Sequence, residues 1–487
     1  MSAQSPLLDA DRFRPTDGRG YQLLPFDFTK LDKDRYILTN VAGEHVVAPT
    51  DLLHSLIRHR VDHRSPIYEH LKARHFLIDD SASTAIDLLS TQVRTKHAVF
   101  ADFTGLHIFV PTLRCTHGCS YCQVSQQTED LCAYDMSGEV ADASVDFMFR
   151  SPSPYLKVEF QGGEPLLRFD LVKHIVHKVK DHPAYEHRSV DFVICTNLSP
   201  LTDDMLEFCQ LHDVCISTSL DGPRDLHNQH RHFLRGDSYD STIQGISRAR
   251  AALGPDRVSA LMTTTRGSLS RGPDIIDEYL RQGFRSVFLR PINPYGRAVE
   301  RNDAYEYSVD EWLSFYKDTL AYIFDVNNRG VRFREDFSAI ILRKMLTPFE
   351  TGFVDLRSPA GIGIGVLVYN YDGGVYLSDE ARMLAEMGDR HFRLGSVVGD
   401  TYEALMLNDR LLAMLDSTMT VGVPGCERCA FQAFCGADPV KHYRLQGDYV
   451  GYKPTSEFCQ RNMGVMKHLV RLLEDDSECG RILRSWA

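Results

Sequence analysis

The chain has 487 residues and a formal net charge of −12, from 54 Lys and Arg against 66 Asp and Glu. At roughly 150 residues per domain, this length predicts about three domains. The acidic balance argues against a nucleic-acid partner, because binding to nucleic acid depends on clustered cations. Hydrophobic residues make up 43% and charged residues 25%, a composition that excludes disorder for most of the chain.

The N-terminal sequence MSAQSPLLDADRFRP has no basic segment followed by an apolar one, so it does not read as a secretory signal. No run of about 20 apolar residues predicts a membrane span. We therefore expect a cytoplasmic protein without a membrane partner. Thiols stay reduced in that compartment, so the 12 cysteines are expected to be metal ligands, catalytic groups or core residues.

Residues 1–95 contain no cysteine and predict a separate α+β module. YQLLPFDF, DRYILTNV and GEHVVAP indicate three strands with turns between them. Three short helices are expected to follow, in TDLLHSLIRHRV, SPIYEHLKARHFLI and the segment after DDSAS. This order of elements is typical of a winged-helix-like fold, and the plainer alternative is a structural N-terminal extension.

Residues 96–305 alternate between strand and helix patterns. The predicted strands are 106–113, 155–160, 189–195, 213–220, 257–265 and 285–292. Six such βα units predict an α/β fold with a parallel sheet, open or closed into a partial barrel, whose active residues gather at the carboxyl ends of the strands. A helical linker is expected at 306–355, followed by a Cys-containing region at 356–487.

Cys115, Cys119 and Cys122 follow the first of these strands with C-x3-C-x2-C spacing, and Tyr121 precedes the last of them. A structural zinc site uses four ligands, and a [4Fe–4S] cluster usually has four cysteines. Three thiolates would leave one iron open. The triplet resembles the signature of radical S-adenosylmethionine (SAM) enzymes, which implies a partial (β/α)6 barrel, a SAM-binding [4Fe–4S] cluster and SAM itself.

The strands that follow add further candidates for SAM binding. By the same resemblance, the motif after the second strand receives the amino group of SAM, and the ends of later strands contact its ribose or carboxylate. The implied residues are Tyr121, Gly162, Gly163, Glu164, Pro165, Asn197, Ser219 and Arg231. Ordinary hydrogen bonding at a strand end is the alternative for Asn197 and Ser219. His227, His230 and His232 fit a solvated helix or loop better than a metal site.

A second set of cysteines, Cys426, Cys429, Cys435 and Cys459, can close a metal site completely. The region resembles the SPASM domain of peptide-modifying radical SAM enzymes, whose full pattern binds two auxiliary [4Fe–4S] clusters. Here SPAG at 358–361, Ser378 and Asp438 stand at positions of missing cysteines. The resemblance therefore implies one auxiliary [4Fe–4S] cluster, with tetrahedral zinc as the alternative.

Asp379 follows Ser378 and has two possible roles. In related sulfatase-maturing enzymes, an aspartate at this position is a proposed general base. Alternatively, SDEAR only begins a helix, with Ser378 as its cap. The remaining cysteines show no ligand spacing, and Cys195 and Cys215 are expected to pack as small hydrophobic residues.

Taken over nearly its whole length, the chain resembles the radical SAM maturase of the His-Xaa-Ser peptide system, related to enzymes that form cyclophanes. The resemblance implies that a 5′-deoxyadenosyl radical removes hydrogen from a ribosomally made precursor peptide and that a side-chain cross-link forms. It also implies a leader segment bound by the N-terminal module and an electron donor such as flavodoxin or ferredoxin. The alternatives are oxidation of a Ser or Cys in a protein substrate and, more remotely, a non-catalytic zinc scaffold.

Overall fold

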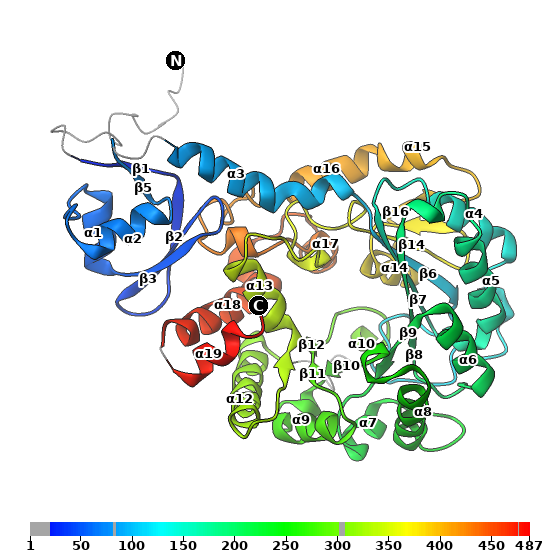
Figure 1. Ribbon diagram of the computed structural model, residues 1–487. Helices are drawn as coiled ribbons and strands as arrows, with labels where there is room; N and C mark the ends of the chain where they lie inside the picture. Colours follow the sequence, from blue (N-terminus) through cyan, green and yellow to red (C-terminus); the bar gives the residue numbers. More distant parts are fainter. Residues whose placement is uncertain (1–19, 81–83, 301–306, 476) are drawn as a thin grey trace.

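The computed structural model describes residues 20–80, 84–300, 307–475 and 477–487. Its centre is a curved sheet of nine strands in the order β12-β10-β9-β8-β7-β6-β14-β15-β16 (Figure 1). The six predicted strands of the core form its parallel part, and the α/β barrel prediction is confirmed. They are β6 (Leu106–Thr112), β7 (Tyr155–Gly162), β8 (Ser189–Thr196), β9 (Val214–Ser219), β10 (Val258–Thr264) and β12 (Leu289–Pro291).

The sixth predicted strand, 285–292, is divided in the structure. β11 (Ser286–Val287) pairs with β13 (Arg334–Glu335), whereas β12 pairs with β10. The break lies at Phe288, which lines the central cavity. The two halves pair with different strands, so the predicted strand does not form as one continuous element.

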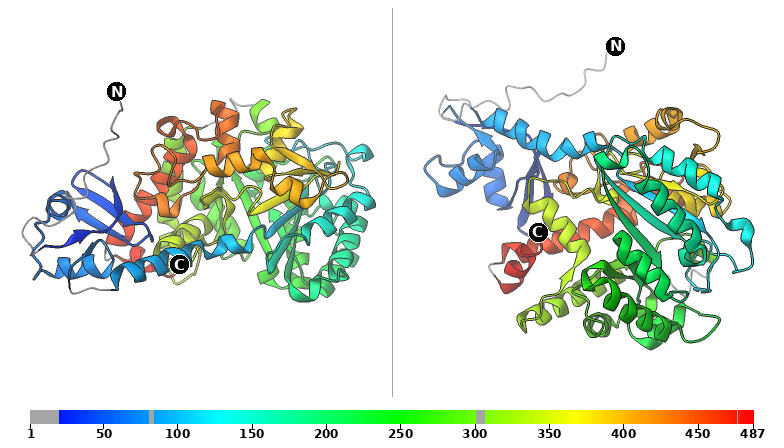
Figure 2. Two further views of the ribbon diagram at one scale, coloured as in Figure 1. Left: turned by 90° about the horizontal axis from the view of Figure 1, so that it is seen from above. Right: turned by 45° about the vertical axis from the view of Figure 1, so that its right-hand side comes forward.

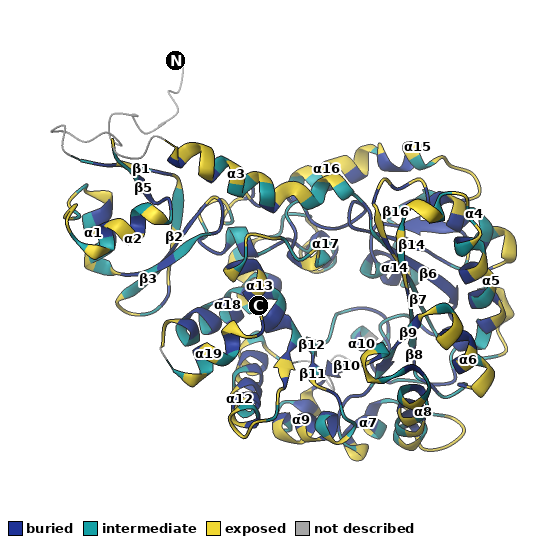
Figure 3. Cartoon of the chain, in the orientation of Figure 1, coloured by how far each residue is buried: buried dark blue, intermediate teal, exposed yellow. Residues whose placement is uncertain are grey.

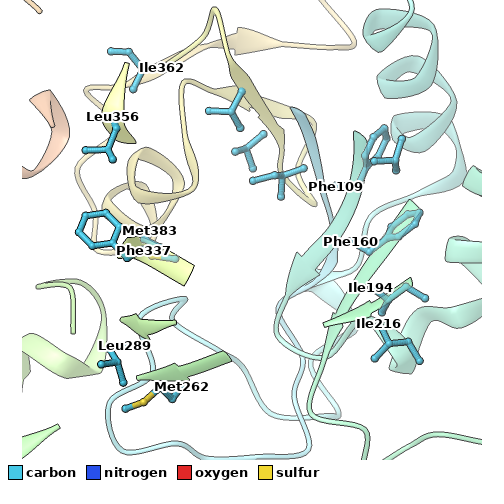
Figure 4. Close-up of a cluster of buried hydrophobic side chains, with 14 of the residues drawn as sticks. Phe109, Phe160, Ile194, Ile216, Met262, Leu289, Phe337, Leu356, Ile362 and Met383 are labelled. Atoms are coloured by element: carbon cyan, nitrogen blue, oxygen red, sulfur yellow. The ribbon is translucent and has the colours of Figure 1, made fainter. Parts of the chain in front are cut away.

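Helices cover the outer face of the barrel. The helix after β7 keeps one apolar stripe, and Val172, Ile175, Val176 and Val179 on it are fully buried. Large side chains from several strands form the core that Figure 4 shows, including Phe109, Phe160 and Ile194. Exposed residues lie on the outward sides of these helices (Figure 3). The helices are α4 (Gly138–Met148), α5 (Phe169–Lys180), α6 (Asp203–His212), α7 (Arg224–His230), α8 (Ser238–Leu253) and α9 (Gly272–Arg281). A short helix, α10 (Arg297–Glu300), follows β12, and the amide of its Arg297 donates to the carbonyl of Cys122 at 2.9 Å.

The C-terminal region continues the same sheet. Its strand β14 (Val366–Tyr369) runs parallel to β6, with Val366 opposite Leu106, and β15 (Gly374–Tyr376) and β16 (Arg393–Ser396) add antiparallel strands. The region therefore shares a hydrophobic core with the barrel. Its helices are α14 (Asp379–Glu386), α15 (Tyr402–Met406), α16 (Asp409–Ser417), α17 (Pro439–Gln446), α18 (Glu457–Glu474) and α19 (Glu478–Arg484).

The segment predicted as a helical linker contains α12 (Val309–Asn328) and α13 (Asp336–Leu346). α12 begins with a capping box between Ser308 and Glu311. It packs against α9 on one side and α18 on the other. The segment therefore joins the barrel to the C-terminal region through buried contacts along its length.

The N-terminal module holds a three-stranded antiparallel sheet, β2 (Phe26–Lys30), β3 (Arg35–Asn40) and β4 (His45–Pro49). The first predicted strand is split around Pro25, because β1 (Gln22–Leu23) pairs instead with β5 (Leu77–Ile78). The sequence pattern did not predict β5. The helices α1 (Thr50–Ile57), α2 (Pro66–Ala73) and α3 (Ala85–His97) complete the module, and α3 runs from it toward the barrel (Figure 1).

The module rests on the C-terminal region (Figure 2). The amide of Ala430 donates to Thr29 Oγ1 at 3.0 Å, and Arg471 donates to the carbonyl of Leu31. The rings of His45 and Phe434 meet edge to face at 5.7 Å. Strand β2 therefore lies beside the loop that contains the second set of cysteines. Within the described residues, no helix has the length and apolarity that crossing a membrane requires.

Candidate active site

A cavity of about 560 Å³ lies inside the curved sheet and is lined by side chains from all six parallel strands and from the C-terminal region. Most of the predicted site residues meet there. The cavity lining includes Cys115, Cys119, Tyr121, Cys122, Gly162, Gly163, Asn197, Ser219, Arg231 and Asp379. Glu164 and Pro165 are buried beside it.

The cysteine triplet sits on the loop that follows β6. The amide of Gly118 donates to the carbonyl of His232 at 2.8 Å, and the amide of Ser120 donates to that of His230 at 2.9 Å. These bonds fasten the loop to the end of α7, so the two chain segments together hold the thiols in the cavity.

The three thiols of this triplet are close enough to influence one another. Burial, with smaller contributions from Glu164 and Cys119, raises the pKa of Cys115 well above its ordinary value. Burial also raises the pKa of Cys119 to about 12. Protein amide groups already point at this sulfur set: His117 N and Asn197 Nδ2 donate to Cys115 Sγ at 3.4 and 3.7 Å. Three adjacent thiols with N–H donors fit the ligation of an iron–sulfur cluster, and binding would displace their protons.

The glycines of the GGEP motif allow β7 to approach the cysteine loop. A Cβ on Gly163 would lie 2.2 Å from the carbonyl oxygen of Arg114. Gly162 has φ +123°, a conformation that suits glycine. The two glycines therefore allow close packing of the end of β7 against the start of the cysteine loop.

Glu164 has three donors from its own chain. Its carboxylate accepts from Thr196 Oγ1 at 2.7 Å, from Asn197 N at 2.8 Å and from Leu166 N at 3.0 Å. Burial raises its pKa to about 7, although these donors oppose the rise. In this structure Glu164 joins the ends of β7 and β8; its contact with an amino group of SAM stays a prediction.

Arg231 is paired with an acid that the sequence analysis did not single out. Its guanidinium donates to both carboxylate oxygens of Asp221, at 2.9 and 3.1 Å, and lies over the ring of Tyr121. Tyr121 OH donates to the same carboxylate at 2.5 Å. Burial favours a higher pKa of Asp221, but Arg231 holds that pKa below its ordinary value. The predicted contact of Arg231 with SAM would be made by a guanidinium that is already oriented by this pair.

The histidines near Arg231 have structural roles. His227 Nε2 and His117 Nε2 share the hydroxyl of Ser238 at 3.1 and 2.9 Å. Burial lowers the pKa of His227 to about 4 and that of His117 to about 3. His227 is fully buried, so the expectation of a solvated helix or loop is wrong for it.

The four cysteines of the second set also converge. Cys426, Cys429 and Cys435 come from one loop, and Cys459 from the first turn of α18. Burial and the other three thiols raise the pKa of Cys435 to about 12. Asn462 Nδ2 donates to Cys435 Sγ at 3.9 Å. Four mutually close thiols from two segments fit a closed site.

The arrangement of these thiols bears on the zinc alternative. In the described part of the chain, no three or more His, Cys, Asp or Glu side chains are arranged to hold one metal ion. Four cysteines can ligate either one zinc ion or a [4Fe–4S] cluster, so both stay predictions for this set.

Ser378 and Asp379 begin α14, and Ser378 Oγ accepts from the amide of Ala381 at 3.2 Å. Asp379 Oδ1 accepts from Arg382 Nε at 2.9 Å, and Arg382 is fully buried. Both residues also line the cavity. The helix-start interpretation is thus confirmed for Ser378, and the general-base role of Asp379 stays a prediction.

Sequence reasoning missed a charged wall of the cavity. Glu380 and Asp438 line it beside Asp379, together with Asp355, Arg290 and Arg461. These residues come from five separate segments, so no spacing in the sequence could signal them. Cys195, which we expected to pack as a hydrophobic residue, also lines the cavity, and its thiol donates to Glu159 Oε1 at 3.3 Å.

Comparisons with known proteins agree with this geometry. The profile of the radical SAM superfamily matches residues 109–280. Over 334 residues, the chain is 22% identical to the cysteine-type anaerobic sulfatase-maturating enzyme of Clostridium perfringens, covering 66% of this chain and 84% of the relative.

Two solved structures share the fold. The enzyme anSMEcpe with bound AdoMet aligns with a TM-score of 0.65 at 15% identity, over 78% of this chain and 100% of that one. Streptococcus suis SuiB bound to its precursor peptide SuiA aligns with a TM-score of 0.53 at 12% identity, over 89% and 98%. Residues 109–280 therefore match the radical SAM superfamily, the chain has the radical SAM fold, and it is an enzyme.

Proposed function

We propose that this enzyme modifies a ribosomally made precursor peptide and forms a side-chain cross-link in it. The observation that carries the proposal is a cavity lined both by the cysteine triplet and by residues of the C-terminal region. SAM held at the triplet would share this space with a substrate side chain. The likeness to SuiB, which was solved with a precursor peptide, supports a peptide substrate.

In this proposal Cys115, Cys119 and Cys122 hold a [4Fe–4S] cluster, and Cys426, Cys429, Cys435 and Cys459 hold one auxiliary cluster. With SAM bound and an electron from a donor such as flavodoxin or ferredoxin, the first cluster supplies a 5′-deoxyadenosyl radical. The chain itself binds, orients and shields. Gly162 and Gly163 offer backbone to SAM, whereas Asn197, Ser219 and Arg231 line the space around it.

The N-terminal module is proposed to bind the leader segment by adding it as a strand to its sheet. The contacts of Thr29 with Ala430 and of Leu31 with Arg471 support this proposal, because they join the sheet to the C-terminal region. A leader held there would bring the following peptide toward the cavity.

The test is co-expression of the enzyme with each short open reading frame that neighbours its gene, followed by mass spectrometry. A cross-linked product loses two hydrogens and stays cyclic on fragmentation. The alternative, oxidation of a Ser or Cys side chain as suggested by the sulfatase-maturating relative, gives a linear peptide that reacts with a hydrazide. A peptide of unchanged mass in every pairing contradicts the proposal.

A further inference from the structure

We propose that Glu380 accepts a proton from the substrate, and that Asp379 has a structural role in helix α14 through its ion pair with Arg382. This inference rests on the proposed function, because it assigns a proton acceptor for that reaction. The sequence resemblance implies the general-base role for Asp379 and assigns no catalytic role to Glu380. The argument begins with the partners of each carboxylate.

Asp379 forms an ion pair with Arg382 of its own helix. Arg382 Nε and Nη2 both lie 2.9 Å from Asp379 Oδ1, and the Arg382 side chain has 0% exposure. A buried guanidinium needs a carboxylate partner, because an unpaired charge in the interior is strongly unfavourable. Asp379 therefore has a structural task that holds its carboxylate toward Arg382.

Glu380 has no such partner. Neither a hydrogen bond nor an ion pair joins its carboxylate to another residue in the part of the chain that the structure describes. Its side chain lines the cavity next to Asp355 and Asp438. Asp438 caps α17 by accepting from the amide of Lys441 at 2.9 Å, so Glu380 and Asp355 are the carboxylates left to face a ligand.

Two other residues that line the cavity have buried polar atoms with open hydrogen-bonding positions. Asn462 and Trp312 have 1% exposure each, and Asn462 Oδ1 and Trp312 Nε1 have no hydrogen-bond partner among the described residues. A buried polar atom without a partner costs about 1–3 kcal/mol. An acceptor and a donor left open on one cavity fit a substrate that carries both, as a peptide does.

The surroundings of Glu380 favour holding a proton. Burial raises its pKa to about 8, and the negative charges of Asp355, Asp379 and Asp438 add to this, whereas Arg290 opposes it. A carboxylate whose pKa lies near the working pH is an effective acceptor. The groups facing it from neighbouring elements are Asp355, Asp438, Arg290, Tyr295 and, through Asp355, Arg461.

The proton transfer is one part of a balanced oxidation. A substrate X–H bond breaks, its electron pair stays on X for the new bond, and the proton moves to Glu380. Removal of two hydrogens overall also requires the loss of one hydrogen atom and one electron. With SAM and an iron–sulfur cluster bound, the hydrogen atom would go to the SAM-derived radical, and the electron would go to the cluster.

The first test compares Glu380→Gln with Glu386→Gln in reconstituted enzyme, using the peptide modified in the co-expression experiment. Glu386 is on the same helix, bonds to Asn370 and does not line the cavity. We expect Glu380→Gln to form 5′-deoxyadenosine but to lose cross-linked product at least 100-fold, because a positioned proton acceptor contributes about 10²–10⁴-fold. The variant should also lose the rise of product formation through about pH 8. Full product formation with an unchanged pH profile overturns the inference and leaves the proposed function standing.

The second test does not depend on the reaction. A carboxyl whose pKa is raised in the folded protein binds its proton more tightly there than in the unfolded chain, where the pKa is about 4.3. Stability therefore falls as pH rises from about 4.3 to about 8, and Glu380→Gln should be more stable than wild type at the upper end. Equal stability of the two proteins at every pH contradicts proton holding by Glu380. If wild type modifies no peptide, the proposed function fails, and this measurement still decides whether Glu380 holds the proton.

Discussion

Arg231 and Asp221 form a two-point ion pair inside the barrel, with N–O distances of 2.9 and 3.1 Å. Their side chains are 12% and 2% exposed. Asp221 also accepts from the amide of Thr263 at 3.1 Å. The pair therefore joins the loop after β9 to β10 and orients the guanidinium toward the proposed SAM site.

Asp221→Asn should destabilise the protein by about 3–5 kcal/mol at neutral pH, because it leaves a buried guanidinium unpaired. Arg231 holds the pKa of Asp221 below its ordinary value. This stabilisation is therefore present above the unfolded pKa of about 3.9 and is lost as pH falls through the folded pKa. Denaturant unfolding against pH checks both points. Asp225→Asn, at an exposed ion pair with Arg271, is the control, and an equal loss in both variants contradicts the prediction.

Cys119→Ala and Cys435→Ala should each remove about half of the bound iron, because each would disrupt one of the two proposed [4Fe–4S] clusters. Only Cys119→Ala should also abolish SAM cleavage. Iron and sulfide analysis with a 5′-deoxyadenosine assay measures both effects. Cys209→Ala, at a buried thiol outside both sets, should keep the full iron content. SAM cleavage by Cys119→Ala would refute the assignment of the triplet.

Glu164→Gln should weaken SAM binding by roughly tenfold or more, which corresponds to about 1.5–3 kcal/mol for hydrogen bonds to a charged group. The carboxylate positions Asn197 by accepting from its amide, and an amide side chain cannot accept from all three present donors. Equilibrium dialysis with SAM measures the change. Glu207→Gln, at an exposed residue of α6, is the control; equal affinities in the two variants would show that Glu164 does not support the site.

Gly163→Ala should cost about 1–3 kcal/mol of stability and lower the occupancy of the first cluster, because its Cβ would clash with the cysteine loop. The nearest atoms are backbone oxygens at 2.2 and 2.4 Å, which cannot move as a side chain can. Gly138→Ala is the matched control, since no atom lies within 4 Å of a Cβ there. Thermal unfolding and iron content report the difference, and two variants with equal iron content would contradict it.

Thr29→Val should cost about 1 kcal/mol and lower the occupancy of the auxiliary cluster alone. The hydroxyl accepts from Ala430 N at 3.0 Å, directly after Cys429. Thr39→Val on β3 is the matched control, because the buried Thr39 hydroxyl has no hydrogen-bond partner among the described residues. We expect that control to be neutral or stabilising. Unfolding experiments and iron analysis check both, and loss of the first cluster in Thr29→Val would be evidence against a local effect.

Local sequence determined the parts that depend on short-range chemistry. Local residue patterns predicted the positions of the core strands, and the spacing of Cys115, Cys119 and Cys122 predicted a loop of three adjacent thiols. The stripe from Leu171 to Val179 specified the buried face of α5. These features need only neighbours in the chain, so one sequence suffices to predict them.

Tertiary structure decided the rest. The division of 285–292 between β11 and β12, the pairing of β1 with β5, and the joining of β14 to β6 depend on which distant strand offers free backbone groups. The charged wall at Glu380, Asp355 and Asp438 exists only because separate segments close around one cavity. Tertiary structure also gives the neighbours Asp379 and Glu380 different surroundings. Asp379 pairs with Arg382, whereas Glu380 lines the cavity without such a partner among the described residues.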